Sequence, residues 1–363
     1  MAFQVPDEWQ PHLQDIVSTP GVTVVIGAVD TGKTSFCALL ANQALRAGVS
    51  TAVVDGDMGQ SEIGPPTTVG LGIVESPIQA LSDVEPRALC FIGTTSPVGH
   101  LLTSASGAKI LVERAAELGR KLVIVDTTGL VRGLVARTLK THKIELLRAK
   151  HIVALQKADE AEHFLRFFDA WRDCTIHRLP VSPAVRLKSQ TLRAQRRAVR
   201  FREYFRGGQA LDISLEQMPT SGTWLHTGSP LEPKSLTSAS RALRSEVIHG
   251  ELIGQMAGRP LGLYLVAKET YNRQGVEELK QEFGTSAVVV VPAAKYANLI
   301  VGLVDEHLNV LALGIVQKID FRTRTAVVFA PLRSIQPVRA IRFGFLKLLP
   351  DGTEIGRIRP GEV

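Results

Sequence analysis

The chain has 363 residues, of which 45% are hydrophobic and 21% charged, and its formal net charge is +7. This length and ordinary composition predict two globular domains. No apolar run approaches the ~20 residues of a membrane span, and the first residues do not resemble a signal peptide. The three cysteines are few and widely spaced, which argues against a disulfide framework or a zinc pattern. We therefore expect a cytoplasmic protein with no membrane partner.

The first part of the chain alternates between strand and helix patterns. Residues 1–20 form a short lead-in, expected to hold one amphipathic helix that ends at Pro20-Gly21. Beyond it, buried strands are expected at 22–26, 51–54, 89–92, 122–125 and 151–155, and helices at 35–47, 101–118 and 135–149. This series predicts an α/β fold over residues 21–182, with a doubly wound parallel sheet that binds ligands at the carboxyl ends of its strands.

A basic segment and then a β-rich region follow. Between Arg178 and Arg206 nine residues are Lys or Arg and one, Glu203, is acidic, so the positive charge is concentrated here. We expect residues 183–208 to be helical and exposed. Short β-branched runs then come at 261–266, 287–291, 298–304, 310–316 and 326–329. Separated by Gly, Pro and Asp, these runs predict a smaller, mainly antiparallel β domain over residues 209–363.

The segment Gly27–Thr34 matches the phosphate-binding loop pattern GxxxxGK[ST] and lies between a predicted strand and a predicted helix. In such a loop the backbone N–H groups and the helix N-terminus bind phosphate oxygens. Lys33 is expected to reach the β- and γ-phosphates, and the Thr34 hydroxyl is expected to hold Mg²⁺. The sequence therefore predicts binding of a nucleoside triphosphate. The residues expected to contact it are Gly27, Asp30, Thr31, Gly32, Lys33, Thr34 and Ser35.

Three aspartates follow predicted strands of the same sheet. Asp55 and Asp57 come just after the strand at 51–54, and Asp126 ends the apolar run 122–125 in the Walker-B manner. An aspartate in such a position is often a helix N-cap. Phosphoryl transfer, however, needs one carboxylate for the metal and another to orient the nucleophile. We expect Thr34, Asp55 and Asp126 to hold the metal, with a further aspartate to accept a hydroxyl proton.

The same region permits a GTPase interpretation. Residues 126–129 read DTTG, which matches the DxxG element of GTPases, and residues 156–159 read QKAD, close to the guanine-reading NKxD. Gln156 stands where that element has Asn. A regulatory or metal-delivery GTPase therefore remains an alternative at this point.

Several stretches together resemble the polynucleotide 5′-hydroxyl kinase family, which includes the RNA kinase subunit of mRNA 3′-end cleavage and tRNA splicing, pre-rRNA processing kinases, and smaller archaeal and bacterial relatives. The resemblance covers most of residues 18–363 and rests on Gly27–Thr34, on DGDMGQSEIGPP at 55–66, on GTTSP at 93–97, on TTG at 127–129 and on REYF at 202–205. It implies a P-loop NTPase domain, ATP or GTP with Mg²⁺, and transfer to the 5′-OH end of RNA, with DNA as a possible acceptor. Protein partners are not indicated.

The resemblance also implies roles for individual residues. Lys33 would bind phosphates, Asp57 would orient or deprotonate the 5′-hydroxyl, and Asp55 with Gln60 would support the metal and its waters. Lys188 and Arg193 match the two lid cations that touch the γ-phosphate. The catalytic set is thus Lys33, Asp57, Lys188 and Arg193. The set implied to bind nucleic acid is Gln60, Thr127, Thr128, Gly129, Arg132, Arg196, Arg197 and Arg200.

Two positions depart from the family pattern. The first lid cation is Lys188 where the family favours Arg, and Lys lacks the planar fork that grips a phosphate. Leu130 stands where the family has a Trp that stacks on the terminal base. These departures keep open a catalytically weak nucleotide-binding scaffold in an RNA-processing complex. The histidines His100, His142, His151 and His163 have no ligand spacing, and we expect them to be structural or surface residues.

Overall fold

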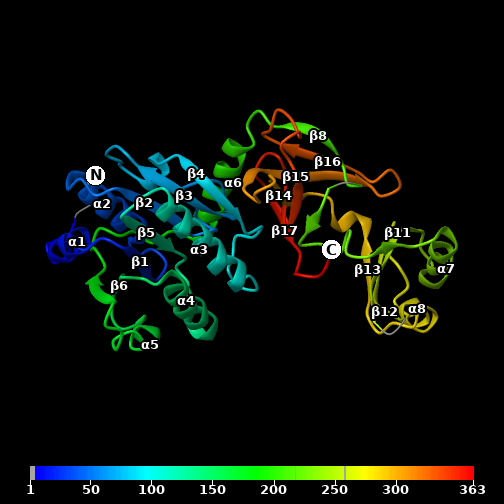
Figure 1. The fold of residues 1–363 in the computed structure, drawn as a ribbon, viewed down its shortest axis with the longest axis horizontal. Coiled ribbons are helices and arrows are strands. Elements are labelled where there is room, and N and C mark those ends of the chain that lie inside the picture. Colours follow the sequence, from blue (N-terminus) through cyan, green and yellow to red (C-terminus); the bar gives the residue numbers. More distant parts are fainter. Residues whose placement is uncertain (1–4, 217, 257–258) are drawn as a thin grey trace. The chain divides into compact units, whose positions relative to one another are not determined.

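The computed structural model describes residues 5–216, 218–256 and 259–363, and these form two compact units, Met1–Phe201 and Arg202–Val363 (Figure 1). The first unit is built on one seven-stranded sheet in the order β4-β3-β2-β5-β1-β6-β7. Every neighbouring pair is parallel except the two that involve β3. The strands are β1 (Val22–Gly27), β2 (Thr51–Gly56), β3 (Thr68–Val74), β4 (Pro86–Phe91), β5 (Leu122–Thr127), β6 (His151–Gln156) and β7 (Thr175–Pro180).

Helices pack on both faces of this sheet because its central strands are apolar on both sides. On one face α1 (Trp9–Ser18) and α2 (Lys33–Arg46) cover Val25, Val53 and Ile124. On the other face α3 (Leu101–Glu117), α4 (Gly133–Leu147) and α5 (Glu162–Leu165) cover the alternate strand residues. The predicted doubly wound α/β fold is confirmed.

The strand register brings the predicted functional segments to one edge of the sheet. β5 pairs with both β1 and β2, so that Asp126 lies opposite Val25 on one side and Asp55 on the other. The loop after β1 leads into α2, and the loop after β2 contains Asp57. The phosphate loop and the aspartates therefore meet at the carboxyl ends of three adjacent strands. The short 3-10 turn η1 (Leu81–Asp83) lies between β3 and β4, and α6 (Gln190–Tyr204) carries much of the basic segment.

In its described residues the second unit contains two sheets, with the helices α7 (Pro233–Leu243) and α8 (Gly275–Phe283) beside one of them. Its four-stranded sheet has the order β10-β11-β12-β13, and α7 and α8 share a core with it. The larger sheet has the order β18-β17-β14-β15-β16-β8, with β9 (Thr220–Ser221) paired to β17, and has a separate core. The remaining elements are β8 (Gln209–Ser214), β10 (Ser229–Pro230), β11 (Val247–Met256), β12 (Arg259–Ala267), β13 (Val288–Pro292), η2 (Ala293–Lys295), β14 (Leu299–Val304), β15 (Val310–Asp320), β16 (Thr325–Ala330), β17 (Ala340–Leu348) and β18 (Glu354–Arg357).

Two strands of the first sheet were not predicted. β3 contains Gly70 and Gly72, which weaken the strand pattern, and β7 is an edge strand in which the exposed residues Thr175 and Arg178 interrupt the apolar ones. In the part of the chain that the structure describes, no helix is both long enough and apolar enough to cross a bilayer.

Candidate active site

The phosphate loop is a tight turn between β1 and α2. Gly32 adopts a left-handed conformation with φ of 88° just before the helix begins at Lys33, a conformation that glycine tolerates best. The Lys33 side chain is buried, and its Nζ donates to the Ala28 carbonyl oxygen over 2.8 Å. The Thr31 hydroxyl donates to the same oxygen over 2.9 Å. The loop thus curls around Ala28 and places a buried cation at the N-terminus of α2, where an anion binds.

Thr34 and Asp126 form the pair on which a metal site would be built. The Thr34 hydroxyl donates to Asp126 Oδ2 over 2.6 Å, and the Thr127 amide donates to Asp126 Oδ1 over 2.8 Å. Asp126 is buried, and burial raises the pKa of its carboxyl group. A hydroxyl and a buried carboxylate are hard oxygen ligands of the kind that Mg²⁺ takes beside nucleotide phosphates. Two of the three predicted metal residues, Thr34 and Asp126, therefore suit that ion.

Asp55 holds the loop that follows β2. Its Oδ2 accepts hydrogen bonds from the Glu62 and Ile63 amides, and its Oδ1 accepts one from the Asp57 amide over 3.0 Å. Burial and the neighbouring Asp126 carboxylate raise the pKa of Asp55 to about 8. These bonds give Asp55 a positioning role for residues 57–63, whereas the sequence suggested a metal ligand.

Asp57 is fixed on one side and open on the other. Its Oδ1 accepts the Gly59 and Gln60 amides, each over 3.1 Å, so the side chain is held by its own turn. Within the described chain no residue donates to its Oδ2, and Asp57 lines the same cavity as Lys33. A half-buried carboxylate held in this way can accept a proton from a hydroxyl group placed in the cavity.

The basic segment contacts the phosphate loop directly. The Arg193 guanidinium lies 2.6 Å from Asp30 Oδ2, and the Lys188 backbone amide donates to the same oxygen over 2.8 Å. The Gln60 side chain donates to the Arg193 carbonyl oxygen over 3.4 Å. Partial burial and the nearby Arg196 lower the pKa of the Lys188 amino group. The two cations predicted to act on the γ-phosphate therefore belong to one site with the phosphate loop.

A cavity of about 750 Å³ joins these groups. The predicted residues that line it are Asp30, Thr31, Gly32, Lys33, Thr34, Ser35, Asp57, Gln60, Thr128, Gly129, Lys188, Arg193, Arg196 and Arg197. The predicted residues that do not line it are Gly27, Asp55, Asp126, Thr127, Arg132 and Arg200. Gly27, Asp55 and Asp126 belong to the strands beneath the cavity.

Three residues predicted to bind nucleic acid take different positions. Thr127 is wholly buried, and its hydroxyl donates to the Val25 carbonyl oxygen over 2.8 Å, because this strand residue points into the sheet packing. Arg132 is exposed just before α4 and lies outside the cavity. Arg200 donates to the Glu62 and Gly64 carbonyl oxygens and lines a second cavity of about 310 Å³.

Two buried lysines behind the site were not predicted. The Lys140 amino group donates to the Thr127 hydroxyl and the Thr128 carbonyl oxygen, each over 2.7 Å, and so holds the turn after β5. The Lys143 amino group lies 3.3 Å from Ser104 Oγ. Burial lowers the pKa of Lys143 to about 8 and, together with Lys143, lowers that of Lys140 well below its usual range. The sequence could have indicated their burial, because Lys140 and Lys143 are three residues apart on the face of α4 that also buries Ala136 and Ile144.

The turn after β5 packs tightly against the phosphate loop. A Cβ atom at Gly129 would lie 2.7 Å from Val29 Cα and 2.8 Å from its backbone nitrogen, a distance that real Cβ atoms do not reach. Leu130, which replaces the Trp of the family pattern, lines the cavity beside this contact. Position 130 is therefore placed to contact whatever lies next to the phosphates.

Residues 156–159, which resemble the guanine-reading element of GTPases, lie outside the cavity that contains the phosphate loop. The Gln156 side chain donates to Glu162 Oε1 over 2.8 Å and accepts the Ala161 amide. The arrangement of these residues does not support guanine recognition at this site.

The chain is similar in sequence to proteins of one known family. Residues 27–207 match the family model described as the mRNA cleavage and polyadenylation factor CLP1 P-loop. The chain is 32% identical over 361 residues to a Pyrococcus furiosus protein named polyribonucleotide 5′-hydroxyl-kinase, a match that covers 98% of this chain and 96% of that one. A protein with the same descriptive name from Methanocaldococcus jannaschii is 29% identical over 335 residues, which cover 92% of this chain and 88% of the other.

A solved structure shows a similar fold. The structure of wild-type Clp1p with Pcf11p matches with a TM-score of 0.58 at 14% identity, over 93% of this chain and 78% of that chain. At this identity the likeness concerns the fold alone.

Proposed function

The chain belongs to the family of the CLP1 P-loop and the polyribonucleotide 5′-hydroxyl kinases, and on that premise we propose that it transfers the γ-phosphoryl group of a nucleoside triphosphate to the 5′-hydroxyl end of RNA. The observation that carries the proposal is one cavity lined by Lys33 of the phosphate loop, by Asp57 and by the two cations Lys188 and Arg193. A nucleotide-binding protein without an acceptor has no need for the carboxylate, and a binder of RNA alone has no need for the phosphate loop.

The donor nucleotide binds with its phosphates over the phosphate loop. Lys33 and the amides at the start of α2 contact the β- and γ-phosphates, which replace the Ala28 carbonyl as the partner of Lys33. The cavity continues along α2 past Ala38, Leu39 and Asn42 to residues 79–82, and this wall of apolar and polar side chains offers a place for the base. Thr34 and Asp126 would hold Mg²⁺, which would neutralise charge on the phosphates.

The acceptor hydroxyl binds at Asp57. Because the Gly59 and Gln60 amides fix one carboxylate oxygen, the other is free to accept the proton as the 5′-oxygen attacks the γ-phosphorus. The bond between the γ-phosphorus and the β,γ-bridging oxygen breaks, and the nucleoside diphosphate leaves. Lys33, Lys188 and Arg193 stabilise the negative charge on the transferred group.

The remaining cations suit the RNA strand. Arg196 and Arg197 line the cavity on the side of α6, and the Arg196 guanidinium lies 3.7 Å from Glu62. Both guanidinium groups would contact backbone phosphates behind the 5′ end, and such contacts weaken as salt rises. Thr128, Gly129 and Leu130 form the wall where the terminal nucleotide rests.

We further propose that residues 21–182 form the kinase domain after an N-terminal lead-in (1–20), with 183–208 as a basic lid and 209–363 as a C-terminal, mainly β domain. A cytoplasmic location is supported by the small number and wide spacing of the three cysteines.

Labelled ATP and GTP, each incubated with 5′-OH RNA, 5′-OH DNA or no acceptor, test the function. The kinase predicts label on the oligonucleotide, and loss of that label in Lys33→Ala. Release of free phosphate from GTP alone, unchanged by an acceptor, contradicts the kinase and favours a GTPase. Tight nucleotide binding with no turnover on any acceptor also contradicts it and favours a scaffold. The same assay ranks ATP against GTP and RNA against DNA.

A further inference from the structure

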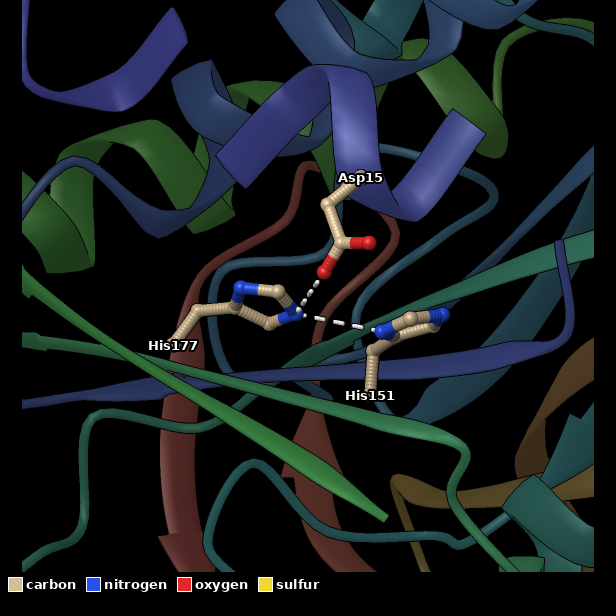
Figure 2. Close-up of side chains that lie close together, drawn as sticks. All are labelled: Asp15, His151 and His177. Carbon is tan, nitrogen blue, oxygen red and sulfur yellow. Dashed lines mark hydrogen bonds and ion pairs between the residues drawn. The ribbon is translucent and has the colours of Figure 1, made fainter. Parts of the chain in front are cut away.

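Three histidines and an aspartate gather where α1 packs against the sheet, in a cluster that the proposed kinase reaction does not use. Asp15 comes from the last turns of α1, His151 is the first residue of β6, and His177 lies on the edge strand β7 (Figure 2). His151 and His177 are buried, and Asp15 is half exposed. None of these residues lines the cavity that contains the phosphate loop.

The side chains point toward one another. His177 Nε2 lies 3.1 Å from His151 Nδ1 and 4.0 Å from Asp15 Oδ2, as Figure 2 shows. One ligand atom from each of the three side chains lies within 4.8 Å of the other two. Two nitrogens bound to one tetrahedral zinc ion at about 2.0–2.1 Å are about 3.3 Å apart. The two histidines are therefore already close to a ligand spacing, and Asp15 is exposed enough to move the remaining distance.

The surroundings fix the ring nitrogen that each histidine presents. His151 Nε2 lies 2.8 Å from the Thr19 carbonyl oxygen, so it carries the proton and leaves Nδ1 with a free lone pair. His177 Nδ1 lies 3.0 Å from His12 Nδ1 on the other side of the ring. A hydrogen bond to the second ring nitrogen is the usual way in which proteins orient a histidine ligand.

We propose that Asp15 Oδ2, His151 Nδ1 and His177 Nε2 bind a divalent transition-metal ion of the zinc type. Imidazole nitrogens with one carboxylate suit such an ion, whereas Mg²⁺ and Ca²⁺ prefer oxygen ligands alone. Three protein ligands leave one position for water on the exposed side of Asp15.

The ion can bind without any of the three histidines gaining or losing a proton, because the protons only move between ring nitrogens. Without the ion, His177 Nε2 donates to His151 Nδ1 and His12 Nδ1 donates to His177 Nδ1. With the ion, the His177 proton moves to Nδ1 and is donated to His12 Nδ1, while His12 carries its own proton on Nε2. Both metal-ligating histidines stay neutral, as ligation requires.

The ion would join three segments that are distant in the sequence. It connects α1 to β6 and β7, beside the existing hydrogen bond from Trp9 Nε1 to the Pro180 carbonyl oxygen. His151 begins β6, whereas the phosphate loop follows the carboxyl end of the adjacent strand β1. The site is thus structural and lies at the opposite edge of the sheet from phosphoryl transfer.

Titration of the full, tag-free chain with Co²⁺ and Zn²⁺ tests the proposal. The protein is first stripped with a chelator, and excess Mg²⁺ is present throughout to occupy the site at Thr34 and Asp126. We expect one equivalent of Co²⁺ to bind with the visible absorption of a tetrahedral ion, and Zn²⁺ to displace it. The melting temperature of the wild type should rise with Zn²⁺.

Three variants decide whether this cluster is the site. His177→Gln should abolish the cobalt absorption, and Asp15→Asn should weaken binding at least about tenfold. His142→Gln, which changes an exposed histidine of α4, is the matched control and should bind like the wild type. Absence of binding by the folded wild type overturns the proposal, and so does equal affinity in Asp15→Asn and the wild type. Asp15 is half exposed, so its variant decides the matter even if His177→Gln does not fold.

Discussion

The Arg193 guanidinium lies 2.6 Å from the Asp30 carboxylate, so a residue of the phosphate loop holds a cation of the basic segment. Asp30 also accepts the Lys188 backbone amide, which gives the two lid cations a common anchor. A γ-phosphate that enters the cavity competes with Asp30 for Arg193, and α6 is already close enough for the exchange.

Asp57→Asn is expected to lower the rate of phosphoryl transfer by roughly 10²–10⁴-fold, because the amide cannot accept the hydroxyl proton. Its oxygen can still accept the Gly59 and Gln60 amides, so the turn should persist. Single-turnover transfer and equilibrium nucleotide binding are measured together, and binding should be unchanged. Asp159→Asn, outside the cavity, is the control. Asp57 is not the base if both variants transfer phosphate at the wild-type rate.

Arg193→Ala is expected to reduce kcat by roughly 10²–10³-fold with a smaller change in the nucleotide KM, since the guanidinium acts on charge that develops in the transition state. Steady-state kinetics at saturating RNA measure both constants. The matched control is Arg186→Ala, an exposed cation of the same basic segment that does not line the cavity. Equal losses in the two variants would mean that general positive charge matters, and not the position of Arg193.

Leu130→Trp restores the aromatic residue of the family pattern and is expected to tighten the binding of 5′-OH RNA. Stacking on a base is worth about 1–3 kcal/mol, which corresponds to a roughly 5- to 150-fold lower Kd. Fluorescence anisotropy with a short oligonucleotide measures it. Leu134→Trp adds the same ring at a neighbouring, highly exposed residue outside the cavity and should leave the Kd unchanged. A Kd at or above the wild-type value in Leu130→Trp contradicts a base-stacking position there.

Lys143→Met is expected to remove a pH dependence of stability between pH 8 and 10.5. The pKa of Lys143 falls to about 8 in the folded chain from an ordinary 10.5, so in this window the unfolded state binds more protons. The Lys143 contribution to stability is therefore complete above pH 10.5 and is lost as the pH falls through 8, by up to about 3 kcal/mol.

Urea unfolding of wild type and Lys143→Met at several pH values measures this contribution as a difference. Lys109→Met, which changes a lysine on the surface of α3 paired with Glu113, is the control. If the wild type and Lys143→Met differ by a constant amount across the window, the buried lysine does not titrate there.

The parts of the site that could be predicted from the sequence are those with a fixed spacing of residues along the chain. Gly27–Thr34 and the aspartates at the carboxyl ends of β2 and β5 were found because a phosphate loop and parallel strands impose a spacing along the chain. Thr127 could not be placed, because whether a residue at a strand end faces the cavity or the packing depends on neighbouring strands. Lys140 and Lys143 carry charge, and a charged helix position reads as exposed until the partners that bury it are known.

The histidine cluster could not be predicted from the sequence either, because its residues are far apart along the chain. His151 and His177 lie 26 residues apart, and Asp15 lies more than a hundred residues from both, so no spacing in the sequence joins them. Only the pairing of β6 with β7 and the packing of α1 bring them together. His151, expected to be a structural or surface residue, is a buried residue in hydrogen-bond contact with His177.

The contact between Gly129 and Val29 ties the acceptor wall to the donor loop. Only a hydrogen atom fits as the substituent at position 129, so the turn after β5 and the phosphate loop are in direct backbone contact. We therefore expect a displacement of Leu130 by an incoming RNA end to shift the nucleotide loop as well. Thermodynamic linkage then requires RNA and nucleotide to change each other's affinity by one and the same factor.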